Sequence, residues 1–184
     1  MTVGEVFSAV SAHMIKGMMF HDQMSRYYGF LGFCGFEKCH AYHYACESKA
    51  YQKLNRFFTE HFGMLVPESE VEDPSAIPES WYTLSRNQVD PQKRIDAVKS
   101  GLASWIAWET MTKEVYQSME KGLFDMGETD AAHYFANLVH DVSCELKGAE
   151  KRQALLSATM YDPIFIVEMQ DELYSEYKEA MKHA

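Results

Sequence analysis

The segment that decides the fold is GMLVPESEVEDPSAIPESWYTLSRNQVDP, residues 63–91, because the helical pattern on either side of it stops there. Pro67, Pro74 and Pro78 each interrupt a helix, and acidic residues dominate the segment. A connection of this length without regular structure is unusual inside a compact domain, so it needs a topological reason. The simplest reason is a crossover over residues 63–90 that runs the length of a helical bundle.

Apolar residues recur at helical spacing on both sides of this crossover. Asp90 and Pro91 are typical of a helix start, and the glycine-rich run GFLGFCGF (29–36) is interpreted as a turn. The helices predicted in this way cover about residues 2–30, 37–62, 91–121, 128–157 and 163–182. The prediction is a single all-α domain over residues 1–184, an antiparallel four-helix bundle with one long crossover and an additional C-terminal helix.

The composition excludes several classes of protein. The chain has 184 residues, 47% of them hydrophobic, and a formal net charge of −10, so it is neither a disordered polymer nor a basic nucleic-acid-binding protein. No apolar stretch approaches the roughly 20 residues that span a bilayer, and the first residues are unlike a signal peptide. The 4 cysteines are few for a chain of this length, which favours reduced thiols, and they form no C-x-x-C pair, so we expect no structural zinc site. We therefore expect a soluble, cytoplasmic protein without nucleic-acid or membrane partners.

Titratable side chains interrupt the apolar face of every predicted bundle helix. They are His21 on the first helix, His40, His43 and Glu47 on the second, Glu109 on the third, and Asp141 and Glu145 on the fourth. Burying such a group without a partner costs free energy, so this repeated placement needs a cause. Carboxylates and imidazoles that converge from four helices can hold a pair of iron or manganese ions, and two adjacent metals can act on oxygen or peroxide.

These positions also have a structural interpretation, in which no metal is bound. A single histidine on an apolar face, such as His21, is commonly hydrogen-bonded to a neighbour, and His40 and His43 can fill space beside aromatic rings. The acidic pair on the fourth helix can face the solvent, whereas Glu109, inside the run WIAWET (105–110), is hard to explain in that way. The histidines interpreted as structural or surface residues are His13, His61, His133, His140 and His183.

Several stretches resemble the ferritin-like superfamily, which includes ferritins and rubrerythrins. The resemblance covers about residues 10–155 and is clearest in ESKAYQKLNRFFTEHFGMLVP (47–67). That stretch is similar to the ferritin pattern in which E-x-x-H is followed by a helix end at glycine and a short extended run. SWIAWETMTKEVYQSM (104–119) resembles the third ferritin helix around its metal-binding glutamate, and LVHDVSCELKGAEK (138–151) resembles the fourth helix near its acidic ligand.

The resemblance transfers only part of the family's metal-binding motif. Glu47 matches the glutamate of E-x-x-H, but Ala50 stands where the histidine would be. Glu109 matches the third-helix glutamate, and Glu145 matches the acidic position of the fourth helix. The second E-x-x-H of the rubrerythrins is absent.

The family's first-helix glutamate is also missing, and His21 or Asp22 stands near its position. Two interpretations remain open: the site is remodelled, or it has decayed and the bundle holds no metal. In the remodelled site, histidines replace the missing groups, two glutamates lie at or near both metals, and the fourth-helix acid is a terminal ligand. The metal ligands would then be Glu47, Glu109, Glu145, His21 and His43.

The first functional hypothesis is a ferritin-like metal-binding protein with a dinuclear iron or manganese site, acting in iron handling or in peroxide and oxygen chemistry. Tyr44 and Tyr51 are candidates for a redox-active phenol beside it, with a packing role as the alternative. The second hypothesis is a metal-free bundle that serves as an assembly or partner-binding protein. It is suggested by the extra helix 163–182, where we expect Tyr174 and Tyr177 to be exposed. The resemblance implies a homo-oligomer.

Overall fold

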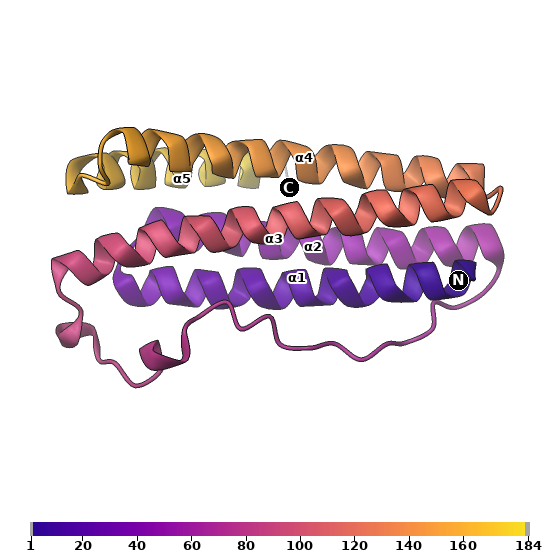
Figure 1. The fold of residues 1–184 in the computed structure, drawn as a ribbon, viewed down its shortest axis with the longest axis horizontal. Helices are drawn as coiled ribbons and strands as arrows, with labels where there is room; N and C mark the ends of the chain where they lie inside the picture. The colour runs from indigo at the N-terminus through magenta and orange to yellow at the C-terminus, as the bar shows by residue number, and fades with distance from the viewer. Residues whose placement is uncertain (1, 183–184) are drawn as a thin grey trace.

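The computed structural model describes residues 2–182, which form five long helices and two short 3₁₀ turns. They are α1 (Val3–Leu31), α2 (Cys34–Phe62), η1 (Glu79–Trp81), η2 (Arg86–Gln88), α3 (Pro91–Asp125), α4 (Thr129–Ala158) and α5 (Pro163–Lys182). Helices α1 and α2 form one hairpin and α3 and α4 the other, and the two hairpins lie side by side (Figure 1). This arrangement confirms the predicted all-α bundle with one crossover and an extra C-terminal helix.

Local sequence signals determine where the helices begin and end. Before α1, the Thr2 hydroxyl accepts a hydrogen bond from the Glu5 backbone N–H at 3.3 Å, and the Glu5 carboxylate accepts one from the Thr2 N–H at 2.6 Å. Before α3, Asp90 accepts a hydrogen bond from the Lys93 N–H at 2.8 Å, and a proline follows at the first helical position. Helix α2 ends at Gly63, whose φ of +67° suits glycine.

The turn between α1 and α2 is shorter than the predicted 29–36. Only Gly32, at φ +85°, and Phe33 lie between the helices, so residues 34–36 belong to α2. Gly35 has a different role, because a Cβ at this position would overlap the backbone carbonyl of Gln170 in α5. The glycine lets α5 pack closely against α2, which is a tertiary cause that a local pattern does not reveal.

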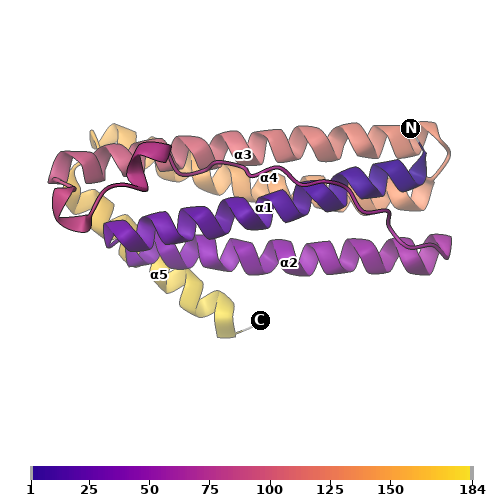
Figure 2. The ribbon, with the colours of Figure 1, turned by 90° about the horizontal axis from the view of Figure 1, so that it is seen from below.

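The crossover follows α1 along the bundle before it enters α3 (Figures 1 and 2). Near the start of α1, the hydroxyls of Ser8 and Ser69 are 2.5 Å apart. Farther along, the Gln23 side chain donates a hydrogen bond to Asp73 and accepts one from the Ala76 N–H, each at 2.8 Å. Because these contacts are spaced along the same helix, they hold the crossover against the bundle as it passes from one hairpin to the other.

The apolar interior is divided into two cores along the bundle. One core contains Phe7, Met14, Leu54, Phe58, Leu123 and Phe135. The other contains Phe20, Met24, Tyr28, Phe36, Leu102, Trp105 and Leu156. Between them, the buried polar residues His21, His40, Glu109 and Thr112 form a layer across the middle of the bundle. We call this region the polar layer.

Helix α5 packs across the first part of α2 and lies at an angle to the bundle (Figure 2). An ion pair of 2.5 Å between Arg152 on α4 and Glu176 also holds it in place. Tyr174 and Tyr177 are half-buried rather than exposed, and their rings stack with centroids 6.4 Å apart. In the described part of the chain, no helix is both long and apolar enough to cross a membrane.

Candidate metal centre

All five predicted ligands lie at the level of the polar layer and come from all four bundle helices. They are His21 on α1, His43 and Glu47 on α2, Glu109 on α3 and Glu145 on α4. Each takes a position where the apolar face of its helix would otherwise continue, so helical periodicity directs it inward. The structure brings these side chains together, while their role as ligands stays a prediction.

Two histidine–carboxylate pairs form the centre of the layer. Nε2 of His21 is 3.6 Å from Oε1 of Glu109, and both side chains are almost fully buried. Nδ1 of His43 is 3.2 Å from Oε2 of Glu145. The imidazoles of His21 and His43 stack, with ring centroids 5.1 Å apart and planes at 22°. The four groups therefore form one connected cluster.

Glu47 joins this cluster because Gly17 leaves room for it on α1. A Cβ at residue 17 would stand 3.3 Å from Oε1 of Glu47 and 3.3 Å from the ring of Trp108. Such a distance is tighter than most Cβ contacts, so a side chain at this position would press on the carboxyl. Gly17 was not singled out from the sequence, although a glycine one turn before His21, inside a helical pattern, was the available signal.

Burial changes the charge that these carboxyls carry. It raises the pKa of Glu47 to about 8, and the charges of Glu145 and Glu109 add to the effect. Burial likewise raises the pKa of Glu109 to about 8, again with a contribution from Glu145. At neutral pH, both carboxyls are therefore mostly protonated while no cation is near them.

Glu145 and His43 form the charged pair of the layer. Burial disfavours the charged form of both, but their attraction for each other outweighs it, so the pKa of Glu145 is lowered and that of His43 is raised. Burial, followed by the charge of His43, holds the pKa of His21 well below its ordinary value. The layer thus contains one ion pair and the neutral imidazoles of His21 and His40, whose pKa values burial lowers, beside the protonated carboxyls.

Two further side chains orient the cluster. The indole N–H of Trp105 donates a 2.9 Å hydrogen bond to Oε1 of Glu109. The Nδ1 atoms of His21 and His40 are 3.0 Å apart, so one donates to the other. When His21 is the donor, its Nε2 carries a free lone pair on the side of Glu109. Metal-binding histidines commonly donate their other ring N–H to a partner in this way, so His40 is placed to position His21.

The donor atoms fit a pair of iron or manganese ions by chemistry. Nε2 of His21 is buried without a hydrogen-bond partner, which is rare for polar atoms in proteins, and Nδ1 of His43 faces the Glu145 carboxylate at 3.2 Å. Imidazole nitrogens and carboxylate oxygens suit both metals. Within residues 2–182, no group of three or more His, Cys, Asp or Glu side chains could hold a metal ion as it stands. The carboxyls must therefore turn from their present partners before the five residues can act as ligands.

The tyrosines expected near the site take other places. Tyr44 is 44% exposed, which removes it as a buried phenol, and Tyr51 packs against the edge of the Phe7 core. Tyr116 is a buried phenol near the carboxyls, and its pKa is held well above the ordinary value by burial and then by the charges of Glu47, Glu109 and Glu145.

The remaining histidines lie outside the cluster. Nε2 of His13 is 2.9 Å from the Thr112 hydroxyl, the ring stacks on Trp108 with centroids 5.0 Å apart, and burial lowers the pKa of His13 to about 4. His61 stacks on Phe57. The other three are His133 and His140, which are exposed, and His183, which lies outside the described residues.

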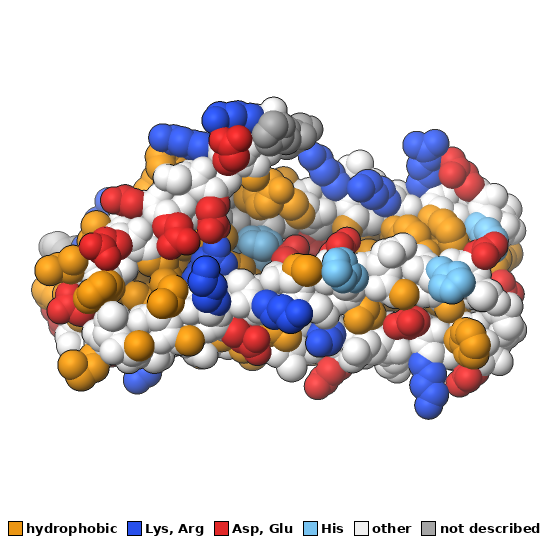
Figure 3. Space-filling view, turned by 90° about the horizontal axis from the view of Figure 1, so that it is seen from above, with side chains coloured by type: hydrophobic (Ala, Val, Ile, Leu, Met, Phe, Trp, Pro, Cys, Tyr) orange, Lys and Arg blue, Asp and Glu red, His pale blue; other side chains and the backbone are white. Residues whose placement is uncertain are grey.

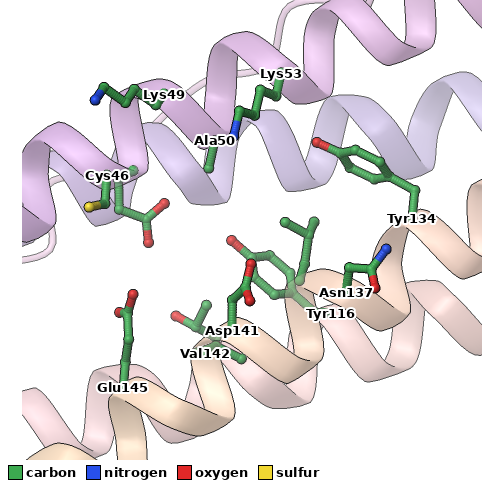
Figure 4. A pocket seen from close by; sticks show the side chains of 13 residues that line it. Cys46, Lys49, Ala50, Lys53, Tyr116, Tyr134, Asn137, Asp141, Val142 and Glu145 are labelled. Carbon is green, nitrogen blue, oxygen red and sulfur yellow. The ribbon is translucent and has the colours of Figure 1, made fainter. Parts of the chain in front are cut away.

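A pocket of about 380 Å³ opens between α2 and α4 and reaches the polar layer. Glu47 and Glu145 line it, together with Asp141, Tyr116 and Ala50. In Figure 4, the Glu145 and Asp141 side chains point into the space between the two helices. On the face that α4 and α5 present, acidic and histidine side chains gather near the middle of the molecule (Figure 3). The layer is therefore accessible from one side of the bundle.

No protein-family profile and no curated protein matches this chain. Solved structures do match. An Archaeoglobus fulgidus ferritin engineered into a closed form has a TM-score of 0.77 and 14% sequence identity, over 95% of this chain and 96% of that one. A humanized archaeal ferritin has a TM-score of 0.77 and 13% identity, over 93% and 94% of the two chains. An open-pore ferritin from the hyperthermophilic archaeon Archaeoglobus fulgidus has a TM-score of 0.77 and 15% identity, over 93% of this chain and 94% of that one.

At sequence identities this low, the structural similarity establishes the fold alone, and the activity has to be argued from the side chains. The structural match with these ferritins covers 93–95% of this chain. The protein is therefore a divergent chain with the ferritin-like four-helix-bundle fold.

Proposed function

We propose that this protein binds a pair of iron or manganese ions in the polar layer and acts in iron handling or in peroxide and oxygen chemistry. One observation carries the proposal: three carboxyls and two imidazoles from four helices meet in one layer of the bundle, and Nε2 of His21 is buried there without a hydrogen-bond partner. The similar solved structures are ferritins by name, which agrees with a role in iron handling.

The cost of the layer supports a functional origin. Without a cation, burial raises the pKa of Glu47 and Glu109 to about 8, so each must take up a proton to stay in the fold at neutral pH. Replacing buried charged groups by well-packed apolar residues is often neutral or stabilising, so stability alone does not explain the layer. Bound metal ions would replace these protons and balance the carboxylates.

The place of each residue suggests its role. Glu47 on α2 and Glu109 on α3 would lie at or near both ions, and Glu145 on α4 would be a terminal ligand. His21 on α1 and His43 on α2 would supply nitrogen ligands. A bound pair of such ions supplies Lewis acidity and redox chemistry. The Trp105 N–H would keep Glu109 in place, and the apolar cores on either side would keep bulk water out of the layer.

Elemental analysis of protein purified without chelators or an affinity tag tests the proposal directly. The wild type should contain about two iron or manganese ions per chain, which is the content of a dinuclear site. A Glu109→Gln variant keeps the size of the side chain and should lose most of this metal. A Glu114→Gln variant, at an exposed position of the same helix, should keep it.

The outcomes separate the two interpretations of the site. Equal metal content in the wild type and in Glu109→Gln would overturn the assignment of Glu109 as a ligand. No metal in the wild type, even after anaerobic loading with ferrous or manganous ions, would favour the metal-free bundle. Circular dichroism of each variant shows whether a loss of metal reflects a loss of fold.

We also propose that copies of this chain associate. Around the turn from α4 to α5, apolar side chains are exposed: Met160 by 89%, Ile164 by 67%, and Leu155 and Val167 by 50%. Single exposed apolar residues are ordinary, but a group of them is typical of an interface. The same surface favours the second candidate function, a metal-free assembly protein. A monomeric mass in light scattering would contradict association. The cytoplasmic location expected from the sequence stays a prediction.

A further inference from the structure

We infer that the pocket between α2 and α4 binds a small organic acid beside the polar layer, with the carboxylate of the ligand at the mouth and its apolar part inside. The inference rests on the proposed function in one respect, because bound metal ions would balance the acidic side chains at the inner end. It adds a ligand class to that function and a reason for the missing E-x-x-H histidine.

The pocket exists because a small side chain stands next to Glu47 on the inward face of α2. Ala50 is three residues beyond Glu47, so the two lie on the same side of the helix, and both line the pocket. A histidine at residue 50, as in the E-x-x-H pattern, would fill part of this space. The volume of about 380 Å³ lies within the range of roughly 300–1,000 Å³ that small-molecule sites occupy.

The interior of the pocket suits the apolar part of a ligand. Ala50, Leu138 and Val142 contribute hydrocarbon surface from α2 and α4. Thr112 and Tyr116 are buried, and they place hydroxyl groups at the inner end, close to the carboxylates. A ring or a short chain that enters between α2 and α4 would therefore replace water from apolar walls and end beside the proposed ligands Glu47 and Glu145.

The mouth of the pocket has two groups that can receive a carboxylate. Lys49, Lys53, Asn137 and Asp141 line it and are all exposed, while Glu47 and Glu145 line its inner end. Neither lysine forms an ion pair with any described residue. In Figure 4, Lys53 extends toward Ala50, whereas Lys49 points away from the pocket. The Lys53 ammonium and the Asn137 amide are thus the groups that would receive a carboxylate.

The same features argue against a passage for metal ions alone. A cation path is favoured by acidic groups at its entrance, which raise the local cation concentration. Here Asp141 is the single exposed acid of the lining, and the Lys53 ammonium extends into the same space. Between the mouth and the inner end, Ala50, Leu138 and Val142 offer no ligand to a hydrated cation.

Benzoate is a suitable probe, with benzylamine as a cation of similar shape. In manganese-loaded protein, benzoate should bind with a Kd on the order of 1 mM, as expected for so small a ligand, and benzylamine should bind at least several-fold more weakly. Paramagnetic relaxation of the benzoate protons gives the orientation. The para proton should relax faster than the ortho protons, because the ring end opposite the carboxylate would lie nearest the manganese.

Two variants test the location. Ala50→Phe fills the pocket and should abolish benzoate binding while manganese content stays unchanged, and Ala45→Phe, at an exposed position of the same helix, should alter neither. Lys53→Glu should weaken benzoate binding several-fold and strengthen that of benzylamine. Equal benzoate binding in Ala50→Phe and wild type would overturn the inference, as would faster relaxation of the ortho protons. Metal content is measured in the same samples, so failure of the metal centre is recorded separately from failure of the pocket.

Discussion

The stability of the metal-free protein should fall as the pH rises, and Glu109 gives the sharpest test. Burial raises the pKa of its carboxyl from an ordinary value of 4.5 to about 8 in the fold. Between these two values, the folded chain holds a proton that the unfolded chain has released. Because stability decreases with pH wherever the folded state binds more protons, this carboxyl lowers the free energy of unfolding as the pH rises from about 4.5 to about 8.

The size of the effect follows from the same pKa values. For one such group, each pH unit in this range changes the free energy of unfolding by about 1.4 kcal/mol. From about pH 5.5 to about pH 8, Glu109 should therefore remove about 3 kcal/mol. A Glu109→Gln variant lacks this loss, and its amide oxygen can still accept the hydrogen bond of Trp105. In a chain of this length, 3 kcal/mol corresponds to a difference of about 6–12 °C in Tm.

Urea unfolding followed by circular dichroism, with a chelator present, measures the difference between wild type and variant at each pH. The comparison is needed because His13, whose pKa burial lowers to about 4, makes the fold more stable as the pH rises, and both proteins share this contribution. Glu114→Gln is the exposed control and should follow the wild type. Parallel curves for wild type and Glu109→Gln would refute the reasoning, since Glu109 would then not be protonated in the fold.

Three further changes test other parts of the structure. Gly35→Ala places a methyl group against the α5 backbone, so it should lower Tm and expose α5 to proteases. The control Gly122→Ala, in open space, should be neutral or stabilise the protein by up to about 1 kcal/mol. Equal melting curves for Gly35→Ala and the wild type would contradict the close packing of α5 on α2. His40→Leu should weaken manganese binding about 10- to 100-fold in a titration, through misplacement of His21, whereas unchanged affinity would limit His40 to packing. Ile164→Glu should reduce the mass seen by light scattering if the exposed apolar surface is the interface, and an unchanged oligomer would exclude it.

The order and type of the helices could be predicted because they depend on local patterns. The prolines of residues 63–90 end the helical periodicity, and the crossover there is confirmed. The turn at 29–36 was predicted too long because its glycines serve packing. Gly29 leaves room for the Glu37 side chain, and Gly35 leaves room for α5. Neither neighbour can be recognised from the local sequence, since one is set by side-chain conformation and the other by a distant helix.

The candidate site could be predicted as a set of positions but not as an arrangement. Periodicity places five titratable residues on inward faces, and the bundle brings them to one level. Their pairing could not be predicted, because His21 with Glu109 and His43 with Glu145 depend on how the helices are rotated against each other. The contribution of Gly17 was missed for the same reason. Metal binding by these residues stays a prediction.

The division of the interior into two apolar cores has a consequence for how the chain opens. Hydrophobic burial stabilises each half of the bundle by itself, and the polar layer separates the two apolar cores. Native-state hydrogen exchange of the chelated protein should then show two cooperative units that open at different free energies. A cation held by side chains from all four helices would couple these units, so that occupancy of the layer would also determine how long the chain survives in the presence of a protease.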